Sequence, residues 1–209
     1  YVTRVPRGVV GAITPWNWPY TMPVEIIVPA LAVGNAVVWA CAPSTSICAV
    51  KLAECLIDAG LPSGLLNLIT GPGAVVGDEI AVNPEVHALG FIGSVATGHT
   101  VAKQGAGKEL LLEMGGNGPL IILEDANLDK AVEATLLGSF LCSGQSYTAA
   151  ELLLVHENVK DAFVKKLLAA TKEKIRLGNP LDDSTTLGTL QNEVTAAKMD
   201  AHIIDAVNK

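Results

Sequence analysis

The chain has 209 residues, of which 50% are hydrophobic and 17% charged, and its formal net charge is −7. A chain this rich in hydrophobic residues can bury a core, which excludes an intrinsically disordered protein. An acidic chain without a cluster of Lys and Arg lacks the positively charged surface that binds nucleic acid, so we expect no nucleic-acid partner.

Short β-branched runs alternate with longer helical patterns over the first half of the chain. The predicted strands are residues 8–13, 36–39, 65–68, 88–92 and 108–112. The predicted helices, bounded by Pro, Gly, Asn or Ser, are residues 22–32, 44–59, 74–82 and 97–105. This alternation predicts an α/β fold in which a parallel sheet carries helices on both faces.

The pattern changes after Asn117, where a second domain is expected to begin. Asn127 follows an apolar run and is a suitable helix N-cap. Residues 159–175 have apolar positions at helical spacing, and Gly178 and Pro180 end that pattern.

The most apolar stretch, residues 24–39, contains Glu25, Pro29, Gly34 and Asn35. It falls short of the ~20 uninterrupted apolar residues of a membrane span. We therefore expect it to be buried core, and we expect no membrane partner. The chain begins in strand-like sequence without Met or a secretory leader, so missing flanking sequence is expected.

The four cysteines lie in apolar surroundings and are expected to be buried thiols of a cytoplasmic protein. They are Cys41, Cys48, Cys55 and Cys142. Cys48 and Cys55 would lie ~10.5 Å apart along a helix, too far for one zinc ion. The four histidines show no ligand spacing, and no metal is predicted.

Polar or glycine residues follow three of the predicted strands and are candidates for a functional site. Asn17, after the first strand, either donates to an oxyanion or caps the next helix. The stretch 70–77 after the third strand is either a phosphate-approaching loop or a helix-packing turn. Glu113 is either a buried carboxylate of raised pKa, suited to act as a base, or a solvated side chain.

Six segments in this order resemble the NAD(P)-dependent aldehyde dehydrogenase superfamily over essentially the whole chain. They are Pro-Trp-Asn at 15–17, Gly-Asn-Ala-Val-Val-Trp at 34–39, Thr-Gly-Pro-Gly at 70–73, Phe-Ile-Gly-Ser at 91–94, Leu-Glu-Met-Gly-Gly-Asn at 112–117 and Gly-Gln-Ser-Tyr-Thr-Ala at 144–149. The resemblance implies a Rossmann-like NAD(P)-binding domain over residues 1–113 and a partial α/β catalytic domain over residues 114–209.

The resemblance also implies a reaction and a set of site residues. In the family a cysteine thiolate attacks the aldehyde, a hydride passes to the nicotinamide, and a glutamate-activated water hydrolyses the thioester. Asn17 matches the family's oxyanion-hole amide and Glu113 its general base. Positions that match the cofactor cleft are Ile13, Thr14, Trp16, Gly73, Gly77, Phe91, Gly93, Ser94 and Met114.

The nucleophile position departs from the family pattern, because Tyr147 stands where Gly-Gln-x-Cys-Thr has its cysteine. A phenol with a pKa near ~10 is about 0.1% ionised at pH 7, and its ring fills the space of an aldehyde. We therefore expect impaired oxidation of the aldehyde. The alternative is a catalytically silent member that binds nucleotide or a partner. Cys142, five positions upstream, is too distant to replace the nucleophile and is expected to be a core thiol.

The cofactor positions depart as well. Ala40 and Cys41 replace a Lys-Pro pair whose lysine reaches the adenosine ribose in the family. Losing one charged hydrogen bond costs about 1.5–3 kcal/mol, so weakened binding of NAD or NADP is expected. Pro43 replaces an acidic residue that favours NAD, so the sequence selects neither cofactor.

Full members of the family extend beyond both ends of this chain, into the rest of the catalytic domain and an oligomerisation hairpin. Residues 120–123 and 152–155 are expected to be strands of a sheet whose other strands are absent. Open strand edges recruit other chains, so we expect self-association or a partner chain.

Overall fold

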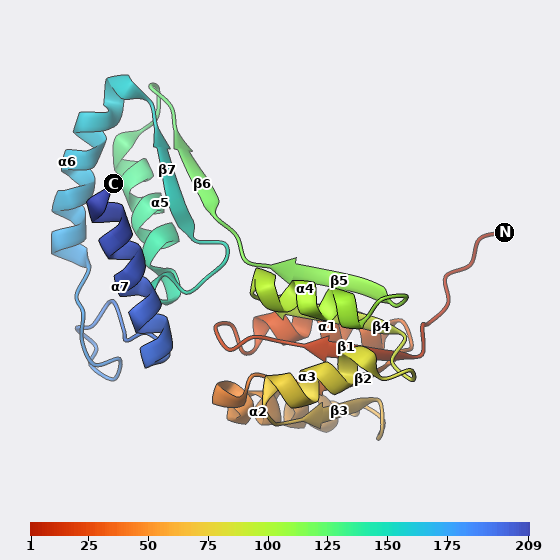
Figure 1. Cartoon of the computed structure of the whole chain (residues 1–209). Coiled ribbons are helices and arrows are strands. Elements are labelled where there is room, and N and C mark those ends of the chain that lie inside the picture. The colour runs from red at the N-terminus through yellow and green to blue at the C-terminus, as the bar shows by residue number, and fades with distance from the viewer. The chain divides into compact units, whose positions relative to one another are not determined.

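The computed structural model describes residues 1–209 and separates them into two units, Tyr1–Gly115 and Gly116–Lys209. The predicted domain boundary lies two residues before this division. Each unit has a parallel sheet of its own (Figure 1).

Five parallel strands form the sheet of the first unit, in the order β3-β2-β1-β4-β5. They are β1 (Val9–Ile13), β2 (Ala36–Ala40), β3 (Leu66–Ile69), β4 (Ala88–Gly93) and β5 (Glu109–Met114). All five predicted strands are present, and the predicted α/β fold with a parallel sheet is confirmed. β5 continues two residues beyond the predicted end, so Glu113 lies within the strand, in register with Ile92 of β4.

Helices cover both faces of this sheet. They are α1 (Thr21–Ala32), α2 (Ser46–Asp58), α3 (Gly73–Val82) and α4 (Val95–Gln104), and a 3₁₀ turn, η1 (Pro43–Thr45), precedes α2. Right-handed crossovers place α1 and α2 on one face, and α3 and α4 on the other. α4 begins two residues before its predicted start because Ser94 caps it, its Oγ accepting from the Thr97 N–H at 3.3 Å.

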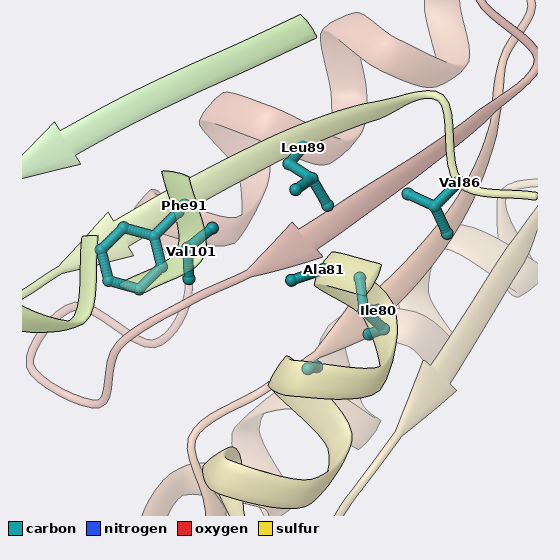
Figure 2. Close-up of a cluster of buried hydrophobic side chains, with 7 residues drawn as sticks. Ile80, Ala81, Val86, Leu89, Phe91 and Val101 are labelled. Carbon is teal, nitrogen blue, oxygen red and sulfur yellow. The ribbon is translucent and has the colours of Figure 1, made fainter. Parts of the chain in front are cut away.

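The core on the α3 and α4 face combines these two helices with β4 and the end of β2 (Figure 2). Its buried members are Ala40, Ile80, Ala81, Val86, Leu89, Phe91 and Val101. Gly11 of β1 faces this cluster, and a Cβ there would meet the Ile80 side chain and lie 2.9 Å from the Leu89 Cδ2. The close approach of α3 to β1 therefore requires glycine at this position.

The prediction that residues 24–39 are buried core holds for only part of this stretch. Ile26 and Ile27 of α1 are buried, whereas Val24, Val28 and Val33 are exposed. A helix on a sheet buries one stripe of its surface, so a continuous apolar run cannot all face the core.

The second unit contains two parallel strands and three α-helices. They are β6 (Gly118–Ile122), α5 (Leu128–Phe140), β7 (Ala150–Val155), α6 (Glu157–Lys174) and α7 (Glu193–Asn208), with the turn η2 (Leu141–Gly144) between α5 and β7. The predicted Asn127 cap is confirmed, since its Oδ1 accepts from the Asp129 and Lys130 N–H groups at 3.1 Å. Ile122, Val132, Leu136 and Phe163 form the core of this unit.

The helix α7 has no counterpart in the sequence prediction. Its N-cap is Asn192, whose Oδ1 accepts from the Thr195 N–H at 2.8 Å. The helix buries none of its residues, so its sequence lacks a clear buried stripe. The Asn-Glu pair at its start was the signal available in the sequence.

The prediction of four buried thiols is also wrong. Cys41 is buried, Cys48 and Cys142 are half-buried, and Cys55 is exposed. α2 packs on β3, an edge strand, and buries only Ala49, so the rest of the helix surface remains accessible. Burial raises the pKa of the Cys41 and Cys142 thiols.

Candidate active site

The carboxyl ends of β1 to β5 meet at one edge of the first sheet, here termed the carboxyl edge. The strand order reverses between β1 and β4, and open α/β sheets bind ligands at such a switch point. The residues after these two strands, Thr14 to Asn17 and Ser94, are among those that the sequence assigned to the site. The topology therefore brings the predicted cofactor positions of the first unit to one edge.

Asn17 lies in the turn between β1 and α1 and is half-buried. The helix begins at Thr21 with Tyr20 as its N-cap residue, and it has no side-chain cap hydrogen bond. Asn17 is therefore not the N-cap residue of α1. Its carboxamide remains the candidate oxyanion donor at this strand end.

Thr14 has a structural role that the sequence did not indicate. Its Oγ1 accepts a hydrogen bond from the Trp39 indole N–H at 2.8 Å, and both residues are buried. Its main-chain N–H donates to the Ala40 carbonyl at 3.1 Å. These two bonds join the ends of β1 and β2 at the carboxyl edge.

Ala40 and Pro43 are the positions that the resemblance assigns to the adenosine half of the cofactor, and this assignment stays a prediction. Ala40 is 5% exposed and packs in the core cluster. Pro43 is exposed and opens η1. Neither side chain carries a charge or a hydrogen-bond donor, so neither can make the contact of a lysine.

The glycines before and within α3 have different surroundings. Gly71 has a φ of +157°, and a Cβ there would lie 2.7 Å from the Val76 Cγ2, so the turn requires glycine. Nothing lies within 4 Å of a Cβ at Gly73, the first residue of α3. Gly77 is buried, and a Cβ added there would lie 3.8 Å from the Ile13 Cδ1, an ordinary van der Waals distance. The buried Gly77 thus fits the packing interpretation, and the open Gly73 fits the approach of a phosphate to a helix N-terminus.

The positions near the end of β4 are largely occupied by packing. Phe91 is 3% exposed within the core cluster, and a Cβ at Gly93 would lie 2.6 Å from its ring. The Met114 side chain packs against the cluster and lies over Gly98. Ser94 caps α4, as described above, and Trp16 is half-buried in the turn after β1. Contact of these side chains with a cofactor stays a prediction.

Glu113 is exposed within β5. Its neighbours along the strand are half-buried, because alternate residues of a strand point to opposite faces. Of the two alternatives for this carboxylate, its exposure agrees with the solvated side chain.

Tyr147 belongs to the second unit and is half-buried in the loop between η2 and β7. Two residues of η2, Cys142 and Ser143, have left-handed φ values of +53° and +56°, and Gly144 follows at +74°. Left-handed backbone costs a non-glycine residue about 1–2 kcal/mol. The prediction of Cys142 as a core thiol is wrong, because this strained turn holds it only half-buried.

The turn is held by side chains to which the sequence analysis assigned no role. Ser143 Oγ donates to the Gly188 carbonyl at 3.1 Å, and Gln145 Nε2 donates to the Cys142 carbonyl at 2.9 Å. Gln145 itself was visible in the Gly-Gln segment, but Gly188, the partner of Ser143, lies 45 residues along the chain and outside any local pattern. No group of three or more His, Cys, Asp or Glu side chains is arranged to hold a metal ion.

The whole chain, residues 1–209, matches the model of the aldehyde dehydrogenase family. It is 42% identical over 210 residues to succinate-semialdehyde dehydrogenase [NADP(+)] of Escherichia coli (strain K12), covering 100% of this chain and 43% of that protein. The structure superposes on succinate-semialdehyde dehydrogenase from Burkholderia pseudomallei with a TM-score of 0.95 and 40% identity, over 99% of this chain and 43% of that chain. It also superposes on PnpE in complex with nicotinamide adenine dinucleotide with a TM-score of 0.92 and 33% identity, over 98% of this chain and 42% of that chain.

The chain thus spans less than half the length of the relatives it matches. None of its helices has both the length and the apolarity needed to cross a membrane. The family match extends over every residue, and the sheet order, carboxyl-edge turns and sequence segments agree with it. The chain belongs to the aldehyde dehydrogenase family.

Proposed function

We propose that the protein belongs to an NAD(P)-dependent system for oxidising an aldehyde to a carboxylic acid, and that oxidation by this chain is impaired by Tyr147. The supporting observation is the carboxyl edge, where turns that match the family pattern follow β1, β3, β4 and β5. A bound nicotinamide nucleotide would supply the hydride acceptor. The open N-terminus of α3 at Gly73 fits its pyrophosphate.

The chain's own residues would perform the remaining steps. The Asn17 carboxamide would donate to the oxygen that gains negative charge during attack on the aldehyde. The Glu113 carboxylate would accept a proton from the hydrolytic water, and its exposure gives water access to it. Tyr147 offers a neutral phenol at the position of the attacking thiolate, so the covalent step lacks its nucleophile.

A second candidate function is that of a catalytically silent nucleotide-binding or partner-binding member. The observation that favours it is again Tyr147, since this substitution removes the nucleophile from the second unit but does not affect the nucleotide positions retained in the first unit. In either case we propose weakened binding of NAD or NADP, because Ala40 offers no ammonium to the ribose. We also retain the cytoplasm as the proposed compartment.

Two measurements on the whole chain separate these functions. Calorimetric titration with NAD and NADP measures nucleotide binding. Absorbance of the reduced nicotinamide measures oxidation of an aldehyde panel that includes succinate semialdehyde, a compound named in two of the relatives. Binding without oxidation is the expected result.

A steady absorbance increase would contradict the impairment if Glu113→Gln abolishes it and Glu25→Gln, an exposed carboxylate on α1, does not. Absence of nucleotide binding would contradict the role of the carboxyl edge. The variant Tyr147→Cys alone should not restore full turnover, because more than half of the relatives' length is absent from this chain.

We further propose that the second unit associates with another chain. Ile121 of β6 and its register neighbour Leu154 of β7 are 62% and 46% exposed, on the sheet face opposite Ile122. Parallel sheets are nearly always covered on both faces.

A further inference from the structure

The Gln145 side chain connects two segments of the second unit that are far apart in the sequence. Its Nε2 donates to the Cys142 carbonyl at 2.9 Å, and its Oε1 accepts from the Gln191 main-chain N–H at 2.9 Å. Ser143 makes a parallel connection, since its Oγ donates to the Gly188 carbonyl at 3.1 Å. Two hydrogen bonds therefore tie the η2 turn to residues 188–191.

The turn that these bonds hold has an unfavourable backbone conformation. Cys142 and Ser143 both lie in the left-handed region, which non-glycine residues seldom occupy consecutively. Such a conformation persists only where surrounding contacts determine it, and it is common beside functional groups. The Gln145 carboxamide supplies contacts of this kind at the end of the turn, two residues before Tyr147.

The backbone of residue 147 is enclosed from a second direction. A Cβ added to Gly116 would lie 2.5 Å from the Tyr147 carbonyl oxygen, and one added to Gly118 would lie 2.9 Å from the Ala149 carbonyl oxygen. The chain before β6 therefore passes directly against residues 147–149. Ser146 is 4% exposed, and its hydroxyl shares a 2.9 Å hydrogen bond with that of Thr148.

We propose that Gln145 is a positioning residue that sets the orientation of the side chain at position 147. It acts by fixing the η2 turn to residues 188–191, while Gly116 and Gly118 allow the opposite segment to close on the backbone of residue 147. The inference rests on the proposed function in one respect, that position 147 is where the family's nucleophile stands. The proposed effect of Gln145 on the side chain at position 147 does not depend on whether the chain oxidises an aldehyde.

The experiment measures the accessibility of position 147 in the whole chain. Tyr147→Cys places a thiol there, and its alkylation by iodoacetamide is followed site by site with mass spectrometry. The exposed Cys55 in the first unit serves as a reference thiol in the same molecule. In this background, Gln145→Ala removes both side-chain bonds, and Gln145→Glu keeps the acceptor for Gln191 but loses the donor to Cys142.

We expect each Gln145 variant to raise the alkylation rate at position 147, relative to Cys55, at least threefold, because release of the turn exposes a half-buried position. The matched control is Gln191→Ala, which retains the main-chain N–H and should leave the ratio unchanged. A second control, Val132→Ala, loosens the core of the second unit without touching the turn and separates general destabilisation from positioning.

Two results would overturn the proposal. One is a change of less than twofold, in both Gln145 variants, in the ratio of the alkylation rate at position 147 to that at Cys55. The other is a rise in Val132→Ala that equals the rise in the Gln145 variants at matched melting temperature, which would make Gln145 one stabilising residue among others. Alkylation requires neither cofactor nor aldehyde, so failure of the proposed oxidation leaves this test intact.

Discussion

The buried hydrogen bond between Thr14 and Trp39 makes a sharp prediction about the carboxyl edge. In Thr14→Val the shape of the side chain is nearly kept, but the oxygen that accepts from the Trp39 indole N–H is lost. Trp39 is 0% exposed and Thr14 5%, so water cannot replace that oxygen without rearrangement of the core. The indole N–H is then left buried without an acceptor.

The expected loss of stability follows from the cost of an unsatisfied buried donor, about 1–3 kcal/mol. With an unfolding entropy of about 2.1 cal/mol/K per residue over the first unit, each kcal/mol corresponds to roughly 4 °C in melting temperature. The expected decrease for Thr14→Val is therefore about 4–12 °C. Thr14→Ser keeps the acceptor and loses one methyl group, a change that costs about 0.5–1.5 kcal/mol.

Urea and thermal unfolding followed by circular dichroism provide the measurement, with Trp39→Phe and the double variant completing a thermodynamic cycle. A coupling energy of about 1 kcal/mol or more between the two positions is expected for a direct buried bond. The reasoning is refuted if Thr14→Val stays within about 0.5 kcal/mol of the unaltered chain. It is equally refuted if the two substitutions are additive.

Four further outcomes follow from the structure. Gly11→Ala should destabilise the first unit by about 1–3 kcal/mol through overpacking against Ile80 and Leu89. Gly73→Ala places its methyl group in open space and should be neutral or stabilising in the same melting experiment. Equal changes in melting temperature for Gly11→Ala and Gly73→Ala would contradict the close packing around Gly11. Ala40→Lys should tighten NAD(P) binding about tenfold or more by calorimetry; an unchanged affinity would mean that position 40 does not face the cofactor. Sedimentation velocity at micromolar concentration should show association that Ile121→Lys weakens, and a stable monomer of 21.7 kDa would contradict the proposed interface.

The sequence was sufficient for the order of the elements, because strand and helix periodicity are local properties of the chain. Each predicted strand of the first unit is present within two residues of its predicted limits. Errors arose where tertiary packing decides exposure, as at Val28 and Cys55. They also arose at α7, whose lack of buried residues removed the pattern by which helices are found.

The candidate site divides in the same way. The sequence alone identifies Tyr147 and Ala40 as departures from the family pattern. It likewise identifies Asn17 as a match to that pattern. The structure was needed to show that the Thr14 hydroxyl accepts from Trp39, 25 residues away, and that Gln145 accepts from the main chain of Gln191, 46 residues away. Spacing along the chain does not determine which polar groups meet once the chain is folded. Residue identity thus determined the chemistry available to this protein, and only the packing of distant segments decided which of those groups are held in place and which face solvent.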